Sequence, residues 1–154
     1  MDSPPPEILA QFNLRGWQLS PITVGLINRT YLARQADERL VLQRVNPIFG
    51  PEVNQDIEAV TAHLAAAGLE TPRLVRTASG EPCVADPKGG IWRVLTHMEG
   101  ETIERVDSAD RAREAGALLG AFHGALRGLL HDFVHRRPGV HDTPAHLLNL
   151  ERAL

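Results

Sequence analysis

Apolar and polar positions in the first third of the chain alternate in short runs. Residues 22–24, 27–33 and 40–45 are rich in apolar side chains, with a glycine corner after the first run and the polar turn 35–38 after the second. Runs of this length, bounded by turn residues, are typical of strands. The pattern predicts three strands joined by two tight connections. Gly25 suits the first connection because glycine tolerates positive φ angles.

Two helices are predicted before residue 70. Residues 7–14 place apolar side chains on one helical face after a run of prolines, so we expect a short structural helix at the domain edge. Pro51 suits a first helical position, and the apolar residues that follow keep helical spacing until Gly68. The second helix therefore follows the third strand directly.

The strand pattern returns at residues 74–75, 83–85 and 91–95, where short apolar runs alternate with turns that contain glycine. Pro21 cannot donate a hydrogen bond to a neighbouring strand, which predicts an edge position or a bulge for the start of the sheet. Together these runs predict an antiparallel sheet of about five strands with one inserted helix.

The period of the apolar pattern changes after Gly100. Ser108 is a good N-cap, and apolar residues recur at helical spacing over residues 115–133. This predicts a long helix of about seven turns. We therefore divide the chain into a mostly β part, residues 1–100, and a helical part, residues 101–154.

A last helix is predicted to begin at Thr143, an N-cap residue that a proline follows. Its leucines continue to Leu154 without a capping residue. An apolar helix face of this kind needs a surface to cover it. We expect residues 145–154 to pack within a larger architecture or to contact a protein partner.

Composition narrows the classes of function. A formal net charge of -3 gives no basic excess that would attract nucleic acid or an anionic membrane. The single cysteine, Cys83, cannot form an internal disulfide, which favours a reducing compartment. No secretory signal and no apolar run of membrane-spanning length are present. We expect a cytoplasmic protein without nucleic-acid or membrane partners.

Several short motifs, in their order along the chain, resemble the aminoglycoside phosphotransferase and choline kinase-like superfamily. They are Gly-Leu-Ile-Asn-Arg-Thr-Tyr at 25–31, Leu-Val-Leu-Gln-Arg-Val-Asn at 40–46, His-Leu at 63–64, Gly-Leu at 68–69, Thr-Pro at 71–72 and Trp-Arg-Val-Leu at 92–95. The branch of N-acetylhexosamine 1-kinases is the most similar, helped by His-Asp-Thr at 141–143. The resemblance implies an α+β fold, with a protein-kinase-like N-terminal lobe followed by helices of a truncated second lobe.

The resemblance also implies a phosphate-binding segment for ATP. Backbone amides around Gly25 and the side chains of Asn28 and Thr30 would donate hydrogen bonds to phosphate oxygens. The family's phosphate-binding cation falls at Gln43, which is neutral. Either neutral hydrogen bonding suffices there, or the adjacent Arg44 contacts the phosphates.

Further binding roles follow from the same resemblance. Val41 would face the adenine ring. The helix carboxylate that orients the phosphate-binding cation would be Glu58 by nearest position. A gap-free alignment puts Ile57 there, and Asp56 is equally close. Backbone groups of a hinge would bind the adenine edge. The hinge consists of Thr96, His97, Met98 and Glu99.

The catalytic loop of such kinases has an aspartate two residues after a histidine and an asparagine a few residues further, and a later aspartate binds Mg²⁺. None of the seven histidines has an aspartate at the second following position. Histidines between residues 131 and 146 form a local cluster, but their spacing completes no metal-binding set, so we interpret them as surface and turn residues. We expect no catalytic residue and no metal ligand in these 154 residues. Mg²⁺ is expected to bind only where the missing catalytic loop and metal ligands are supplied.

The function expected is that of the N-terminal part of an ATP-dependent phosphotransferase that acts on a sugar hydroxyl. Alone, the chain would bind adenine nucleotide weakly and would be inactive. A non-catalytic binding or regulatory module and a truncated gene product are the alternatives. Among enzymes, aminoglycoside-type and choline-type acceptors stay open.

Overall fold

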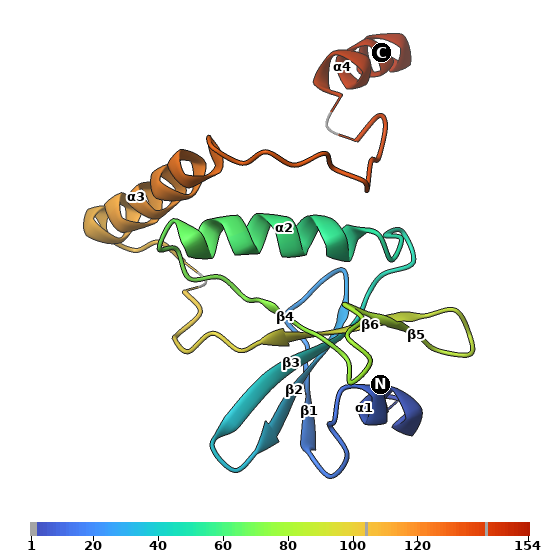
Figure 1. Ribbon diagram of the computed structural model, residues 1–154. Coiled ribbons are helices and arrows are strands. Elements are labelled where there is room, and N and C mark those ends of the chain that lie inside the picture. The colour runs from blue at the N-terminus through green and yellow to red at the C-terminus, as the bar shows by residue number, and fades with distance from the viewer. Residues whose placement is uncertain (1–2, 104, 141) are drawn as a thin grey trace.

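The computed structural model describes residues 3–103, 105–140 and 142–154, which form one antiparallel sheet and four helices (Figure 1). The strands are β1 (Gln18–Ile22), β2 (Arg29–Gln35), β3 (Glu38–Arg44), β4 (Leu74–Val75), β5 (Val84–Ala85) and β6 (Ile91–Thr96). The helices are α1 (Pro6–Gln11), α2 (Val53–Ala66), α3 (Ala109–Leu126) and α4 (Thr143–Ala153).

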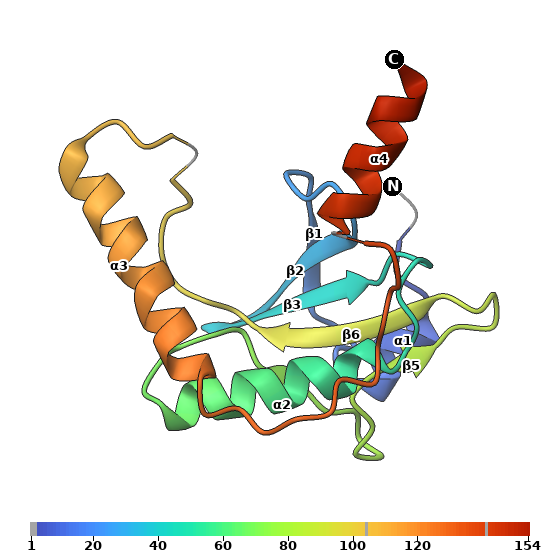
Figure 2. The ribbon, with the colours of Figure 1, turned by 90° about the horizontal axis from the view of Figure 1, so that it is seen from above.

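The six strands follow the order β1-β2-β3-β6-β4, and β5 pairs with the other end of β6. Every pairing is antiparallel. Helix α2 is inserted between β3 and β4 and lies along the sheet (Figure 1; Figure 2). The predicted α+β fold with a kinase-like N-terminal lobe is confirmed.

Strand β1 lies at an edge of the sheet, as Pro21 predicted, and Pro21 pairs with Tyr31 within it. The predicted strand over residues 22–24 is wrong, because β1 ends at Ile22 and β2 begins only at Arg29. The segment between them is a loop whose apolar side chains point to solvent. Val24, Leu26 and Ile27 are 72%, 100% and 56% exposed.

The predicted short helix is present as α1, which buries one side chain, Ile8. The residues that follow it, Phe12 and Leu14, also lie in the core. Tyr31 and Trp92 stack in this core with ring centroids 6.3 Å apart. The buried cluster consists of Ile8, Phe12, Leu14, Tyr31, Ala33, Leu42, Trp92 and Val94.

Helix α2 begins at Val53, because Pro51 and Glu52 form the turn before it, and it ends at Ala66. The predicted stop at Gly68 is confirmed, since this glycine has φ +79° and Leu69 N donates to Leu64 O at 3.0 Å. The N-cap of α4 is Asp142 and not Thr143, the predicted N-cap. The Asp142 carboxylate accepts a hydrogen bond from Ala145 N at 3.1 Å.

Helix α3 starts after the predicted cap Ser108, which accepts a hydrogen bond from Arg111 N, but it ends at Leu126. The prediction of a helix to Phe133 was wrong, because residues 127–140 leave the helix and run along α2 (Figure 1; Figure 2). We call residues 127–140 the strap. His63 Nε2, on α2, lies 2.9 Å from Ala125 O, which fixes the point where the strap begins.

Asp56 of α2 holds the strap. Its Oδ1 accepts from Val134 N at 3.0 Å and lies 2.8 Å from His131 Nε2, and its Oδ2 accepts from His135 N at 2.9 Å. His135 Nδ1 lies 3.0 Å from Glu52 Oε1. Two histidines interpreted as surface and turn residues therefore contact carboxylates, one on α2 and one in the turn before it, 75 and 83 positions away in the sequence.

The two C-terminal helices leave apolar side chains exposed, and neither α3 nor α4 contains a buried residue. In α4, Leu147, Leu148 and Leu150 are each more than half exposed. Within the described ranges, no helix is both long enough and apolar enough to cross a membrane.

Candidate functional site

A row of polar side chains lies on the face of the sheet opposite the α1 core. Gln43 of β3 is paired with Thr30 of β2 and with Arg93 of β6. Their neighbours Tyr31, Leu42 and Val94 belong to the core. Because side chains alternate between the two faces of a strand, these three polar residues share the other face.

Hydrogen bonds connect this row and extend it to α2. Gln43 Oε1 accepts from Arg93 Nε at 3.0 Å, and Gln43 Nε2 donates to Thr30 Oγ1 at 3.4 Å. Arg93 Nη1 donates to Asn54 Oδ1 at 3.2 Å. We call Thr30, Gln43, Arg93 and Asn54 the polar row.

Arg93 is the cation of the polar row, and sequence reasoning missed it. Its side chain is buried, with 9% exposure, and burial lowers the pKa of its guanidinium. Within the part of the chain that the structure describes, no carboxylate lies within 4.0 Å of it. The signal in the sequence was one charged residue inside the apolar run Trp-Arg-Val-Leu at 92–95.

Arg44 is not brought to the polar row. It pairs with Trp92 in the ladder and so occupies the core-side face of β3, where its Nη2 lies 3.6 Å from Asp86 Oδ2. Its guanidinium carbon lies 6.0 Å from the centre of the Trp92 ring. A Cβ on Gly90 would approach the side chains of Arg44 and Asp86 to 2.6 Å, so any other residue there would have to displace them.

The three α2 positions considered for a cation-orienting carboxylate have other surroundings. Glu58 accepts from Arg76 Nη2 at 2.6 Å, away from the polar row. Asp56 holds the strap. Ile57 lines a cavity next to Arg93. The α2 residue that contacts the buried cation is Asn54, which is fully buried and neutral.

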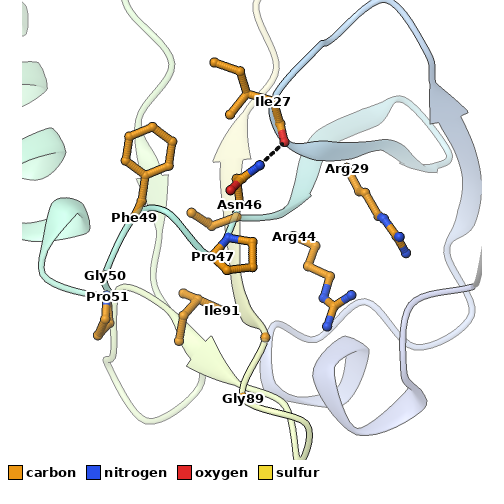
Figure 3. Close-up of a pocket in the computed structure, with 12 residues that line it drawn as sticks. Ile27, Arg29, Arg44, Asn46, Pro47, Phe49, Gly50, Pro51, Gly89 and Ile91 are labelled. Atoms are coloured by element: carbon orange, nitrogen blue, oxygen red, sulfur yellow. Dashed lines mark hydrogen bonds between the residues drawn. The ribbon is translucent and has the colours of Figure 1, made fainter. Parts of the chain in front are cut away.

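The loop 23–28 is tied to the turn after β3. Asn46 N donates to Asn28 Oδ1 at 3.0 Å. Asn46 Nδ2 donates to Ile27 O at 3.2 Å (Figure 3). The Nδ2 group of Asn28 makes no hydrogen bond to any residue described in the structure, so this donor is available. Gly25 does not have a positive φ, contrary to our expectation, and an added Cβ would be 3.8 Å from Asn28 O.

A cavity of about 350 Å³ is lined by the loop itself and the residues that flank it, and two further cavities adjoin the loop. The larger, of about 480 Å³, opens at the end of the sheet, where the side chains of Arg29 and Arg44 extend in the same direction (Figure 3). The smaller, of about 230 Å³, lies between the loop, the end of β3 and α2. Its lining residues are Ile27, Asn28, Val45, Phe49, Val53, Ile57 and Arg93.

An apolar patch continues the face of the polar row toward the expected hinge. Val41 is paired with Leu32 and Leu95, and all three are half-buried. Next to them, Thr96 N donates to Arg73 O at 2.8 Å, and Thr96 Oγ1 accepts from Arg73 N at 2.9 Å. The amide and hydroxyl of Thr96 are therefore occupied.

The remaining hinge residues keep their backbone groups free. Among the residues described, those of His97, Met98 and Glu99 form no backbone hydrogen bond. Glu99 accepts from Arg39 Nη1 at 2.8 Å, which connects the hinge to the start of β3. A cavity of about 530 Å³ lies beside the hinge, lined in part by His97, Met98 and Glu99.

We expect Arg39→Ala to change the free energy of unfolding by less than about 1 kcal/mol, because both partners of the Arg39–Glu99 pair are exposed to solvent and screened. Urea denaturation of the variant at 0.05 M and 0.5 M salt checks this. A loss of several kcal/mol, or a loss that does not shrink in high salt, would show that the pair is a major structural contact.

The described residues hold no group of three or more His, Cys, Asp and Glu side chains that is arranged to bind a metal ion. The arrangement instead combines an apolar patch, a hinge with free backbone groups and a buried cation beneath a glycine-containing loop. The sequence model of the phosphotransferase enzyme family matches residues 18–153, from β1 to the end of α4. The chain therefore belongs to the phosphotransferase enzyme family, within the aminoglycoside phosphotransferase and choline kinase-like superfamily.

Proposed function

We propose that this chain binds ATP on the face of the sheet that carries the polar row. The observation that carries the proposal is the order in which the hinge, the apolar patch and the polar row follow one another along that face. The apolar patch of Leu32, Val41 and Leu95 adjoins the hinge, and the polar row begins two residues further along the strands. An adenine base needs an apolar wall and a hydrogen-bonding edge, and phosphates need donors and positive charge.

Each part of the site then has one role. Val41 packs against the adenine ring, and the free backbone groups of residues 97–99 bind its edge. The loop 23–28 covers the phosphates with backbone amides near Gly25 and with the Nδ2 group of Asn28. Gln43 and Thr30 contribute neutral polar groups to the same face.

Phosphoryl transfer to a sugar hydroxyl is the activity we propose for the architecture to which this lobe belongs, with an N-acetylhexosamine as acceptor. The support for this acceptor is the motif order at 25–31, 40–46 and 92–95, with His-Asp-Thr at 141–143. Mg²⁺ bound together with ATP would neutralise part of the negative charge of the phosphates. The described residues offer no ligand set for it, and we assign no step of the transfer to them.

Calorimetric titration of the chain with ATP, ADP and GTP tests the proposal. We expect weak binding of the two adenine nucleotides, with dissociation constants of about 0.1 to 1 mM, and no heat with GTP. The substitution Val41→Glu, which puts a carboxylate in the apolar wall, should abolish ATP binding. Equal affinity of the unmodified chain for ATP and GTP, or no binding at all, would contradict the proposed site.

A further inference from the structure

We propose that Arg93 of β6 supplies the cation that binds the phosphates of ATP, with Gln43 and Asn54 as the residues that position it. In this arrangement the phosphate-binding charge comes from the strand next to β3, and the residue on β3 is a neutral positioning residue. This inference rests on the proposed function and adds to it the residue that recognises the phosphate groups.

The charge balance around Arg93 is the first argument. Arg93 is only 9% exposed as a residue, and a buried charge is costly unless an opposite charge compensates it. No carboxylate in the described residues is close enough to do so. Burial raises the pKa of the Cys83 thiol, so this group stays neutral and is no counterion either. A bound phosphate would supply the missing negative charge.

The remaining donors of Arg93 are the second argument. A guanidinium has five N–H groups, and in the described structure one Nε–H and one Nη1–H are used by Gln43 and Asn54, which leaves three. Three donors in a planar fork suit the oxygens of a phosphate. Arg93 and Asn28 both line the cavity of about 230 Å³ below the loop.

The identity of residue 43 is the third argument. Gln43 accepts from Arg93 and donates to Thr30, so its amide fixes the guanidinium and satisfies a neighbour at once. A lysine at this position would place a second cation next to the first, and like charges in a poorly hydrated place repel strongly. The neutral Gln43 on β3 is therefore what we expect when the cation, Arg93, lies on β6.

The test compares the affinities of the chain for ATP, ADP and adenosine in the variants Arg93→Gln and Arg44→Gln. Arg44 is the matched control, because it follows Gln43 on β3 but lies on the other face of the sheet. We expect Arg93→Gln to weaken ATP and ADP binding at least about tenfold, with adenosine affinity within twofold of the unmodified chain. Arg44→Gln should leave all three affinities within twofold.

A second measurement needs no substitution at this buried position. In the ¹⁵N-labelled unmodified chain, the Arg93 Nε–H resonance should shift on addition of ATP, ADP or tripolyphosphate and stay in place with adenosine.

Two results would overturn the inference while leaving the proposed function intact. They are ATP binding without movement of the Arg93 resonance, and an equal loss of ATP and adenosine affinity in a folded Arg93→Gln variant. If the unmodified chain binds neither ATP nor ADP, the proposed function fails, and the inference fails with it.

Discussion

Replacing Asp86 by alanine should lower the free energy of unfolding of the chain by about 3 kcal/mol. The carboxylate is 7% exposed, and three donors converge on it. Its Oδ1 accepts from Lys88 N and Gly90 N, each at 2.8 Å, and its Oδ2 accepts from Trp92 Nε1 at 2.9 Å. Alanine would leave these donors and the nearby Arg44 cation without their partner. Urea denaturation measures the loss.

Two variants control for this result. Asp37→Ala removes a carboxylate from the exposed β2–β3 turn and should change the unfolding free energy by less than about 0.5 kcal/mol. Asp86→Asn keeps the shape but turns an amide N–H₂ toward N–H donors, so part of the loss should persist. If Asp86→Ala were as stable as Asp37→Ala, the carboxylate would not hold the β5–β6 hairpin together.

The stability that Asp86 contributes should depend on pH. The Trp92 hydrogen bond, backbone donors and Arg44 hold the pKa of this carboxyl below its usual value, in spite of burial. A carboxyl whose pKa is lowered in the folded state stabilises it fully above the unfolded pKa of about 4. That stability is lost as the pH falls through the folded pKa. Urea midpoints of the unmodified chain and Asp86→Ala should therefore converge below pH 4.

Asp56→Ala should release the strap from α2 and lower the free energy of unfolding by about 2 kcal/mol. Two backbone N–H groups, those of Val134 and His135, and the His131 ring would lose their shared acceptor. The loss should be largely local, because the side-chain hydrogen bonds of Asp56 within the described structure all go to the strap. Hydrogen exchange should speed up in residues 131–137 and along α2, with little change in β2 and β3.

The neighbouring acidic residue of the strap offers the control for this variant. Asp132 is exposed, so Asp132→Ala should leave the exchange rates of the strap unchanged. The hydrogen bonds from His131, Val134 and His135 outweigh burial and lower the pKa of Asp56, so its contribution too should fade as the pH falls below about 4. Unchanged protection of residues 131–137 in Asp56→Ala would mean that other contacts hold the strap.

Local patterns in the sequence were enough for several elements. Alternation identified β2, β3 and β6, Pro21 indicated an edge strand, and Gly68 marked the end of α2. The motif order also led to the family that the sequence comparison supports. These features depend on neighbouring residues or on short spacings, so they can be read without knowledge of the fold.

Long-range pairing decided the rest. Gln43 and Arg93 are 50 positions apart, and only the antiparallel register of β3 with β6 puts the buried cation beside the neutral amide. His131 and Asp56 are 75 positions apart, and their contact stops α3 from continuing to Phe133. Periodicity predicts which face of an element is apolar. It does not predict which distant element covers that face. Arg93 was therefore recognised as the buried cation of the polar row only from the tertiary structure. The sequence had directed attention to Gln43 and Arg44.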